Sequence, residues 1–358
     1  MAGTNISRSS SWHFRVSHEF ALSWLRTIVW GGHIFLKNLV TYFVSMNRGR
    51  QQRRIRVVCL SDTHSQRCDV PDGDLLIHAG DLSINGSAAE IQETIDWLGS
   101  LPHKHKVVIA GNSDLFFDVR SRLPEDRSEM VTSSDKTGER DLPDKSEPGM
   151  LFDWGNVHYL HGTSVTLSFD NGSSNVPRQL NIYGAPLVPK CGPDSENAFQ
   201  YPVGHNPWEG NIPQGTDILV THTPPKYHLD WYYGTPEGCP WLLQELWKVR
   251  PLLHVFGHVH TSYGTERVFW NDTEVRWENF CSDLLGLSSQ DQHTALMDNL
   301  QPRLWVGAVT VILSGVRSLL GTLFSTSRAG AHSTLMVNAA CMSEGGQRLE
   351  KKPHLIYI

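Results

Sequence analysis

Short apolar runs that end in polar residues recur along the middle of the chain. Residues 55–60 are β-branched and almost continuously apolar, which is typical of a strand covered on both faces. Similar runs follow at 75–77, 107–110, 218–220 and 252–256. A capping-box pattern at Ser87 and Glu90 predicts a helix between the second and third runs. Strand, helix and strand with short links form a βαβ unit, so the sequence predicts parallel strands whose carboxyl ends lie together.

The segments between these runs predict a hairpin sheet and two long loops. Strands are expected at 157–160, 165–169 and 180–183, interrupted by turns at Asn171-Gly172 and Gly184. Residues 118–150 are rich in charged residues and serine, which predicts a mobile surface loop. Residues 190–215 are rich in Gly, Pro and Asn and are read as a long loop bordering a site.

Residues 20–46 form an apolar segment long enough to span a bilayer. A basic residue such as Arg26 or Lys37 at mid-bilayer costs roughly 2.5–3.5 kcal/mol, which argues against spanning. On a helix the polar residues fall in one narrow stripe and leave a broad apolar face suited to a membrane interface. The stripe consists of Ser23, Arg26, Thr27, His33, Lys37, Thr41 and Ser45. A helix packed on the domain and an organelle-targeting segment are the alternatives.

A second apolar segment, residues 305–324, has large apolar residues at helical spacing around Arg317. It is either a core helix or, together with residues 20–46, part of a membrane-docking surface. A membrane surface is therefore one partner that the sequence predicts.

Charge is distributed unevenly along the chain, whose net charge is −6. Residues 1–56 hold nine Lys/Arg and one Asp/Glu, which gives this arm +8 and the remainder −14. We therefore expect no nucleic-acid polymer as a partner, while the basic arm suits an anionic membrane leaflet. The six cysteines form no CxxC pair, which favours free thiols in a reducing compartment. The expected location is intracellular, either cytoplasmic or peripheral at the cytoplasmic face of a membrane.

Five of the apolar runs end in residues that can bind a metal ion. These are Asp62 and His64, Asp81, Asn112, His222, and His258 and His260. Because the carboxyl ends of parallel strands meet at one edge of a sheet, we expect these side chains to converge. Carboxylate, amide and imidazole donors suit Mn, Fe or Zn, and the lack of thiolates argues against a purely structural zinc site.

These residues resemble the calcineurin-like metallophosphoesterase superfamily, whose pattern is D-x-H, G-D, G-N-H-[D/E], H and G-H-x-H. The resemblance runs from about residue 55 to 265. The sequence around these residues is most similar to the small branch called metallophosphoesterase-domain-containing proteins. The similar segments are Gly184-Ala185-Pro186, residues 217–225, residues 256–260 and Asn338-Ala339. The resemblance implies an α/β fold of two stacked mixed β-sheets flanked by helices, here with apolar and amphipathic helical appendages.

The resemblance also implies where the parts of the chain begin and end. A basic, apolar and amphipathic arm would occupy residues 1–54, and the metallophosphoesterase domain would occupy 55–284 with a mobile insertion at 118–150. An insertion with an amphipathic helix would follow at 285–333, and residues 334–358 would return to the domain as a strand segment.

Carried over from the family, the ligands imply a site for two divalent ions, with Mn²⁺ expected and Fe or Zn as alternatives. Asp62, His64 and His260 would hold one ion and Asn112, His222 and His258 the other, with Asp81 bridging them. Asn112 and His222 would also bind the substrate. Two such ions can clamp a phosphate and activate a water molecule that attacks in line.

The implied function is hydrolysis of small phosphate esters, most specifically a phosphodiesterase acting on cyclic nucleotides. The alternatives are a phosphomonoesterase of the protein Ser/Thr phosphatase type and a membrane-associated metal-binding protein with little turnover.

Ser113 departs from the family pattern, which has His after Asn112. Asp81, Asn112 and Ser113 are the catalytic residues that the resemblance implies. Because a serine hydroxyl is a poor general acid, we expect esters with poor leaving groups to react slowly, by about 10²- to 10⁴-fold. The next residue, Asp114, either pairs with a site residue or is an ordinary surface acid.

Overall fold

The computed structural model describes residues 9–47, 53–123, 151–172, 176–192, 195–289, 302–324 and 332–358. It divides into two compact units. The sheet unit comprises Gln51–Glu266 and Ser333–Ile358, and the helical unit comprises Met1–Arg50 and Arg267–His332. The mobile loop predicted at 118–150 lies outside the described residues from 124 onward.

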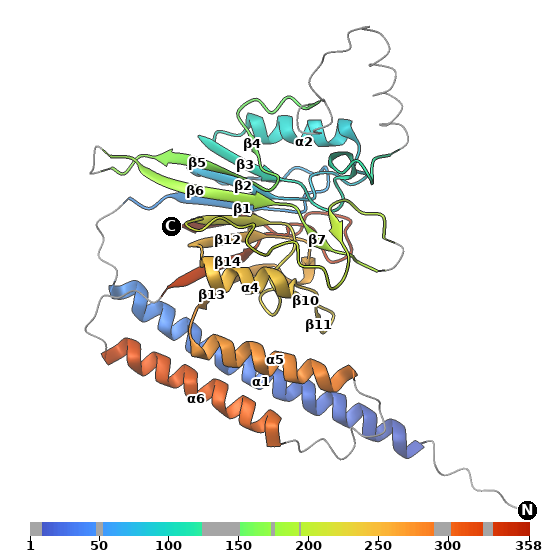
Figure 1. Ribbon diagram of the computed structural model, residues 1–358, viewed down its shortest axis with the longest axis vertical. Coiled ribbons are helices and arrows are strands. Elements are labelled where there is room, and N and C mark those ends of the chain that lie inside the picture. Colours follow the sequence, from blue (N-terminus) through green and yellow to red (C-terminus); the bar gives the residue numbers. More distant parts are fainter. Residues whose placement is uncertain are drawn as a thin grey trace, which may run out of the picture. The chain divides into compact units, whose positions relative to one another are not determined.

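The first sheet of the sheet unit has the strand order β15-β1-β2-β3-β4 (Figure 1). Its strands are β1 (Arg56–Leu60), β2 (Leu75–Ala79), β3 (His105–Ile109), β4 (His158–Tyr159) and β15 (His354–Tyr357). β1 to β4 are parallel and β15 is antiparallel to β1. Helix α2 (Ala88–Ser100) connects β2 to β3, and the Ser87 side chain accepts a hydrogen bond from the backbone of Glu90 at its start. The predicted βαβ unit is confirmed.

The second sheet has the order β14-β12-β9-β6-β5, with β13 (Gly264–Phe269) at its edge. Its other strands are β5 (Thr163–Phe169), β6 (Arg178–Ala185), β9 (Ile218–Thr221), β12 (Leu253–Phe256) and β14 (Ser333–Asn338). β5 and β6 form the predicted antiparallel hairpin, whereas β6, β9, β12 and β14 pair in parallel. Both sheets are therefore mixed, as the fold expectation required.

Shorter elements complete the described residues. They are the paired strands β7 (Val188–Pro189) and β8 (Gln200–Tyr201), the paired strands β10 (Trp231–Tyr232) and β11 (Thr235–Pro236), helix α4 (Pro240–Val249), and the 3₁₀ helices η1 (Leu115–Phe117) and η3 (His260–Ser262). The helical unit contains α1 (Ser9–Asn47), α5 (Asp272–Ser289) and α6 (Pro302–Phe324).

The apolar core explains why the first strand is almost continuously apolar. Val57 and Cys59 belong to the core cluster that includes residues of both sheets. Val58 and Leu60 point to the other face of the same sheet, where they join the cluster that contains Ile91 of α2. A strand covered on both faces has no position left for a polar side chain, so polar residues begin only where the strand ends.

Gly184 does not break a strand as predicted but lies inside β6. A Cβ at this position would come within 2.7 Å of Ile109 Cγ2 and of Leu160 Cβ. Glycine is therefore needed because the chain approaches its neighbours too closely for a side chain, not because the backbone turns here.

The segment 190–215, predicted as a long loop, is mostly without regular structure but is partly buried. It contains β8, and it buries Trp208 with 1% of its surface exposed and Phe199 with 5%. All six cysteines are free thiols, as predicted.

His254 of β12 makes the stability of the sheet unit dependent on pH. It is fully buried, and its Nε2 donates to Thr221 Oγ1 at 2.8 Å because that hydroxyl itself donates to the Thr223 carbonyl. Burial, aided by the charge of His228, lowers the pKa of His254 from 6.5 to about 3. As the pH falls, His254 is therefore protonated in the unfolded chain before it can be protonated in the folded protein. The free energy of unfolding decreases as the pH drops below 6.5.

We expect His254→Gln, which keeps an N–H donor, to reduce this pH dependence. Between pH 7.5 and pH 5 the wild type loses about 2 kcal/mol through this one group. The variant should lose that much less, measured by urea unfolding at both pH values. Parallel pH profiles for the two proteins would show that the histidine does not contribute.

α6 is the helix among the described residues that is long and apolar enough, by length and composition, to cross a membrane. Its most apolar 18 residues have a mean hydropathy of 1.6, and only 17% of them are buried. α6 buries Leu304, Ala308, Val311 and Gly315 and leaves most of its apolar residues exposed, which favours the docking-surface alternative over a core helix.

Candidate functional site

Every predicted ligand follows the carboxyl end of a strand of the sheet unit. Asp62 and His64 follow β1, Asp81 follows β2, Asn112 and Ser113 follow β3, His222 follows β9, and His258 and His260 follow β12. Backbone hydrogen bonds fasten these loops to one another. The Asp62 N–H donates to the Gly80 carbonyl at 2.9 Å, and the Gly257 N–H donates to the His222 carbonyl at 3.1 Å.

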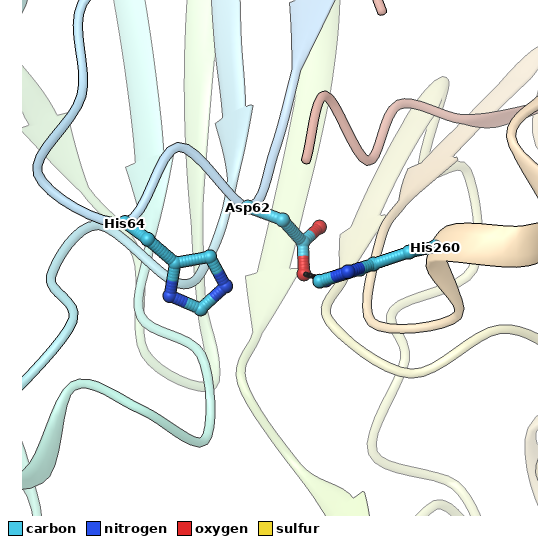
Figure 2. A group of neighbouring side chains, drawn as sticks. All are labelled: Asp62, His64 and His260. Atoms are coloured by element: carbon cyan, nitrogen blue, oxygen red, sulfur yellow. Dashed lines mark hydrogen bonds and ion pairs between the residues drawn. The ribbon is translucent and has the colours of Figure 1, made fainter. Parts of the chain in front are cut away.

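Asp62, His64 and His260 form one group of converging side chains. Each offers a ligand atom, and these atoms lie within 4.8 Å of one another. Figure 2 shows the carboxylate of Asp62 between the two imidazoles, with Asp62 Oδ1 3.1 Å from His260 Nε2. This geometry can hold one metal ion between the loops that follow β1 and β12.

Asp81 lies at the centre of a second group, formed with Asp62 and His222. Its Oδ1 is 3.3 Å from His222 Nε2, and its Oδ2 is 3.6 Å from His64 Nε2. Asn112 adds its Oδ1, which lies 3.0 Å from His222 Nε2. The two carboxylate oxygens of Asp81 thus face different imidazoles, the arrangement that a bridging ligand needs.

His258 lies beside this centre but is not brought into either group of converging atoms among the described residues. Its ring is 5.1 Å from that of His222, between centroids. Its Nε2 lies 3.6 Å from the sulfur of Cys191, and its backbone N–H donates to both oxygens of Asp62 at 3.1 Å. Cys191 was not among the predicted site residues.

Three of the histidines are oriented by backbone carbonyls. The Nδ1 atoms of His64, His222 and His260 lie 3.1, 2.9 and 3.2 Å from the carbonyl oxygens of Ser83, Ala79 and Ser343. A carbonyl oxygen can only accept, so each Nδ1 carries a proton and each Nε2 is the ring nitrogen that faces the centre. Histidines that bind metals are held in this way. Backbone acceptors carry no side-chain signal, so the sequence could not indicate them.

The electrostatics of the centre favour cations. Asp62 is fully buried and Asp81 is 4% exposed. Burial alone would raise the pKa of Asp62, but the hydrogen bond and charge of His260 outweigh it and hold that pKa below its usual range. Burial alone would lower the pKa of His222, but the charge of Asp81 outweighs this effect and raises that pKa to about 9. Two buried carboxylates require nearby positive charge, and the donor set fits a divalent ion.

Ser113 directs both of its polar groups at Asp81. Its backbone N–H donates to Asp81 Oδ1 at 2.8 Å and its hydroxyl donates to Oδ2 at 3.0 Å. The residue that replaces the family histidine therefore holds the Asp81 carboxylate in place.

Asp114 is buried, so the surface alternative for this residue is wrong. Its carboxylate accepts hydrogen bonds from the backbone N–H groups of Leu82, Ser83 and Gly111 at 2.8–3.1 Å. Burial, followed by the charge of Asp81, raises its pKa to about 6. Asp114 thus joins the loops that follow β2 and β3.

Four of the predicted ligands have left-handed backbone conformations. The φ angles are 55° at Asp62, 43° at His64, 55° at Asp81 and 69° at His258. Residues with side chains rarely adopt such angles, and each costs about 1–3 kcal/mol. Strain of this kind gathers where surrounding contacts hold a functional side chain in place.

Comparison with known proteins identifies the family of the chain. The family model described as calcineurin-like phosphoesterase matches residues 55–262. "Metallophosphoesterase domain-containing protein 1" of Homo sapiens is 35% identical over 222 residues, which cover 58% of this chain and 61% of that protein. "Probable rhamnogalacturonate lyase C" of Emericella nidulans is 42% identical over 240 residues, which cover 63% of this chain but 20% of that protein.

The matched segment therefore spans about three fifths of the human relative and one fifth of the other. Among solved structures, TT1561 of Thermus thermophilus aligns over 61% of this chain and 86% of its own, with 13% identity and a TM-score of 0.34. A score this low adds nothing to the match of the family model.

Proposed function

Because the chain belongs to the calcineurin-like phosphoesterase family, we propose that it is a metal-dependent phosphoesterase acting on small phosphodiesters such as cyclic nucleotides. The observation that carries the proposal is the placement of Asp81 between the imidazoles of His222 and His64, each of which faces one of its two carboxylate oxygens. A carboxylate placed in this way suits a bridge between two cations.

In the proposal, Asp62, His64 and His260 hold one divalent ion, and Asn112, His222 and His258 hold the other. Mn²⁺ is the expected ion, and Fe or Zn suits the same oxygen and nitrogen donors. When bound, two such ions supply an activated water molecule and neutralise charge on the phosphate. The carbonyls behind the imidazoles fix the direction of each Nε2, and Ser113 fixes Asp81.

A cavity lined by the neighbour of a residue that contacts Asn112 is the candidate place for the organic group of a small ester. The Asn112 carbonyl accepts a hydrogen bond from the Ala198 N–H, and the next residue, Phe199, lines a cavity of about 480 Å³ together with His161 and Tyr201. Cavities of about 300–1,000 Å³ with aromatic walls are typical of small-molecule sites. We propose that this cavity takes the organic group of the ester.

The proposal is tested by Mn²⁺-dependent hydrolysis of bis(4-nitrophenyl) phosphate, 4-nitrophenyl phosphate and cyclic nucleotides, with metal binding followed by calorimetry. We expect the diester to react faster than the monoester. Preference for the monoester would favour the phosphatase alternative. Binding of Mn²⁺, Fe²⁺ or Zn²⁺ without turnover of any substrate would instead favour a metal-binding protein.

Ser113→His is expected to raise the hydrolysis of an alkyl phosphate diester relative to that of a nitrophenyl diester. The imidazole can protonate a poor leaving group, and such help is worth about 10²- to 10⁴-fold. The measurement is the ratio of the two rates. Ser113→Ala is the matched control, since it also loses the hydroxyl bond to Asp81 but gains no acid. Equal ratios in the two variants would show that residue 113 does not limit the leaving group.

A further inference from the structure

The helical unit exposes large apolar side chains and buries charged ones. On α1, Trp24, Ile28 and Phe35 are 55%, 65% and 62% exposed, and on α6, Trp305, Val309 and Leu313 are 53%, 53% and 62% exposed. We call these six residues the apolar face. So many large apolar side chains exposed on two helices that pack together are unusual on a protein that is surrounded by water.

Two residues of the polar stripe of α1 point inward rather than to solvent. His33 is 1% exposed and Lys37 is 7% exposed. Lys37 Nζ lies 3.1 Å from Glu274 Oε1 of α5, His33 Nε2 lies 3.5 Å from the same oxygen, and the His33 ring stacks on Trp277. Helices in contact with lipid place ionisable residues in this way, toward one another and away from the acyl chains.

α1 and α6 cross closely at glycines. A Cβ on Gly32 of α1 would lie 2.8 Å from Ile312 of α6, and a Cβ on Gly315 of α6 would lie 2.8 Å from Leu36 of α1. Small residues at helix crossings are enriched where lipid surrounds the helices, since close backbone approach then drives their packing.

α5 determines how such a helix pair can meet lipid. It packs against α6, and Asp272 and Arg276 of α5 line a groove of about 590 Å³ together with Arg317 of α6. Leu313 lines the same groove and so lies at the border of the apolar face, beyond which α6 cannot face acyl chains. The pair therefore suits the plane of one leaflet better than a path across the bilayer.

We propose that α1 and α6 lie in the surface of an anionic lipid bilayer, with the apolar face in the acyl chains and α5 toward water. Basic residues outnumber acidic ones in residues 1–56 even with Lys37, Arg53 and Arg56 paired to Glu274, Asp170 and Asp74, and this excess favours anionic over neutral headgroups. Membrane association would hold the phosphoesterase close to substrates released or bound at that surface.

The test is flotation of the full chain, synthesised without cells in the presence of vesicles of phosphatidylcholine with or without phosphatidylserine. We expect the wild type to float, and to float more completely with phosphatidylserine. Ile28→Asp combined with Leu313→Asp should reduce the floating fraction by at least about tenfold. The matched control is Val176→Asp with Val203→Asp, which adds the same charge at exposed valines of the sheet unit and should float like the wild type.

Two results would overturn the proposal: wild type that stays at the bottom, or an Ile28/Leu313 variant that floats as the wild type does. A lipid-free wild-type dimer that the same variant dissociates would assign the apolar face to a second copy of the chain. Should the variant fail to fold, tryptophan quenching by brominated lipids in the wild type decides, since absence of quenching excludes insertion of Trp24 and Trp305.

Discussion

Asp81→Asn is expected to reduce Mn²⁺-dependent hydrolysis of bis(4-nitrophenyl) phosphate by at least about 10³-fold, because the amide cannot bridge two cations. The substitution keeps the size of the side chain and one oxygen that can accept from Ser113, so packing should survive. It removes the negative charge that faces His222 and His64. Calorimetry should accordingly show weaker binding of Mn²⁺ together with the lost turnover.

Asp230→Asn is the matched control for this experiment. Asp230 is as fully buried as the site carboxylates, but its Oδ2 accepts from the backbone N–H groups of Tyr227 and Gly238. The control removes a buried charge outside the ligand set, so turnover should stay close to that of the wild type. If both variants lost activity equally, loss of a buried charge would explain the result and the bridging role of Asp81 would be unsupported.

Gly111→Ala should weaken Mn²⁺ binding and lower turnover by about 10²-fold or more, although it adds a single methyl group. A Cβ at residue 111 would lie 2.2 Å from Asp81 Oδ1, 2.3 Å from the Asp81 backbone nitrogen and 2.8 Å from His222 Cε1. The loop that follows β2 would have to move, and with it the bridging carboxylate. Overpacking of this kind also lowers the free energy of unfolding by about 1–3 kcal/mol.

Gly99→Ala provides the comparison, because a Cβ at the end of α2 meets only Asn156 Oδ1 at an ordinary 3.8 Å. It should keep activity and gain up to about 1 kcal/mol of stability from helix propensity. Measured Mn²⁺ affinity and urea midpoints separate the two effects. If Gly111→Ala bound Mn²⁺ with the affinity of the wild type, the added methyl group would not displace the loop that follows β2, contrary to the prediction.

The strands and the ligand positions could be predicted because each depends on a local pattern. The apolar run before Asp62 and the capping residues Ser87 and Glu90 indicate elements regardless of what packs on them. The side-chain ligands then follow from the rule that strand ends converge in parallel sheets. These inferences require only the order of polar and apolar residues.

What the sequence could not indicate depends on contacts between distant segments. The carbonyl of Ser343 that orients His260 is backbone, which every residue possesses. Nothing in the sequence distinguishes Asp114 from an acidic residue on the surface. Its buried position depends on hydrogen bonds from the backbone N–H groups of Leu82 and Ser83, which lie far away in the sequence. Gly184 was taken for a turn, since the sequence does not reveal that Ile109 and Leu160 come too close for a side chain.

The pairing of β15 with β1 determines when the sheet unit can be completed during synthesis. β1 ends at Leu60, and its antiparallel neighbour begins only at His354. At a translation rate of about 5–20 residues per second, β1 waits roughly 15–60 seconds for this partner on the ribosome. α1 emerges before β1, whereas α5 and α6 emerge within that interval, before β14 and β15. The apolar helices are therefore synthesised while the loops of the candidate site still lack the Ser343 carbonyl that orients His260, so the proposed membrane contact would form before that site is complete.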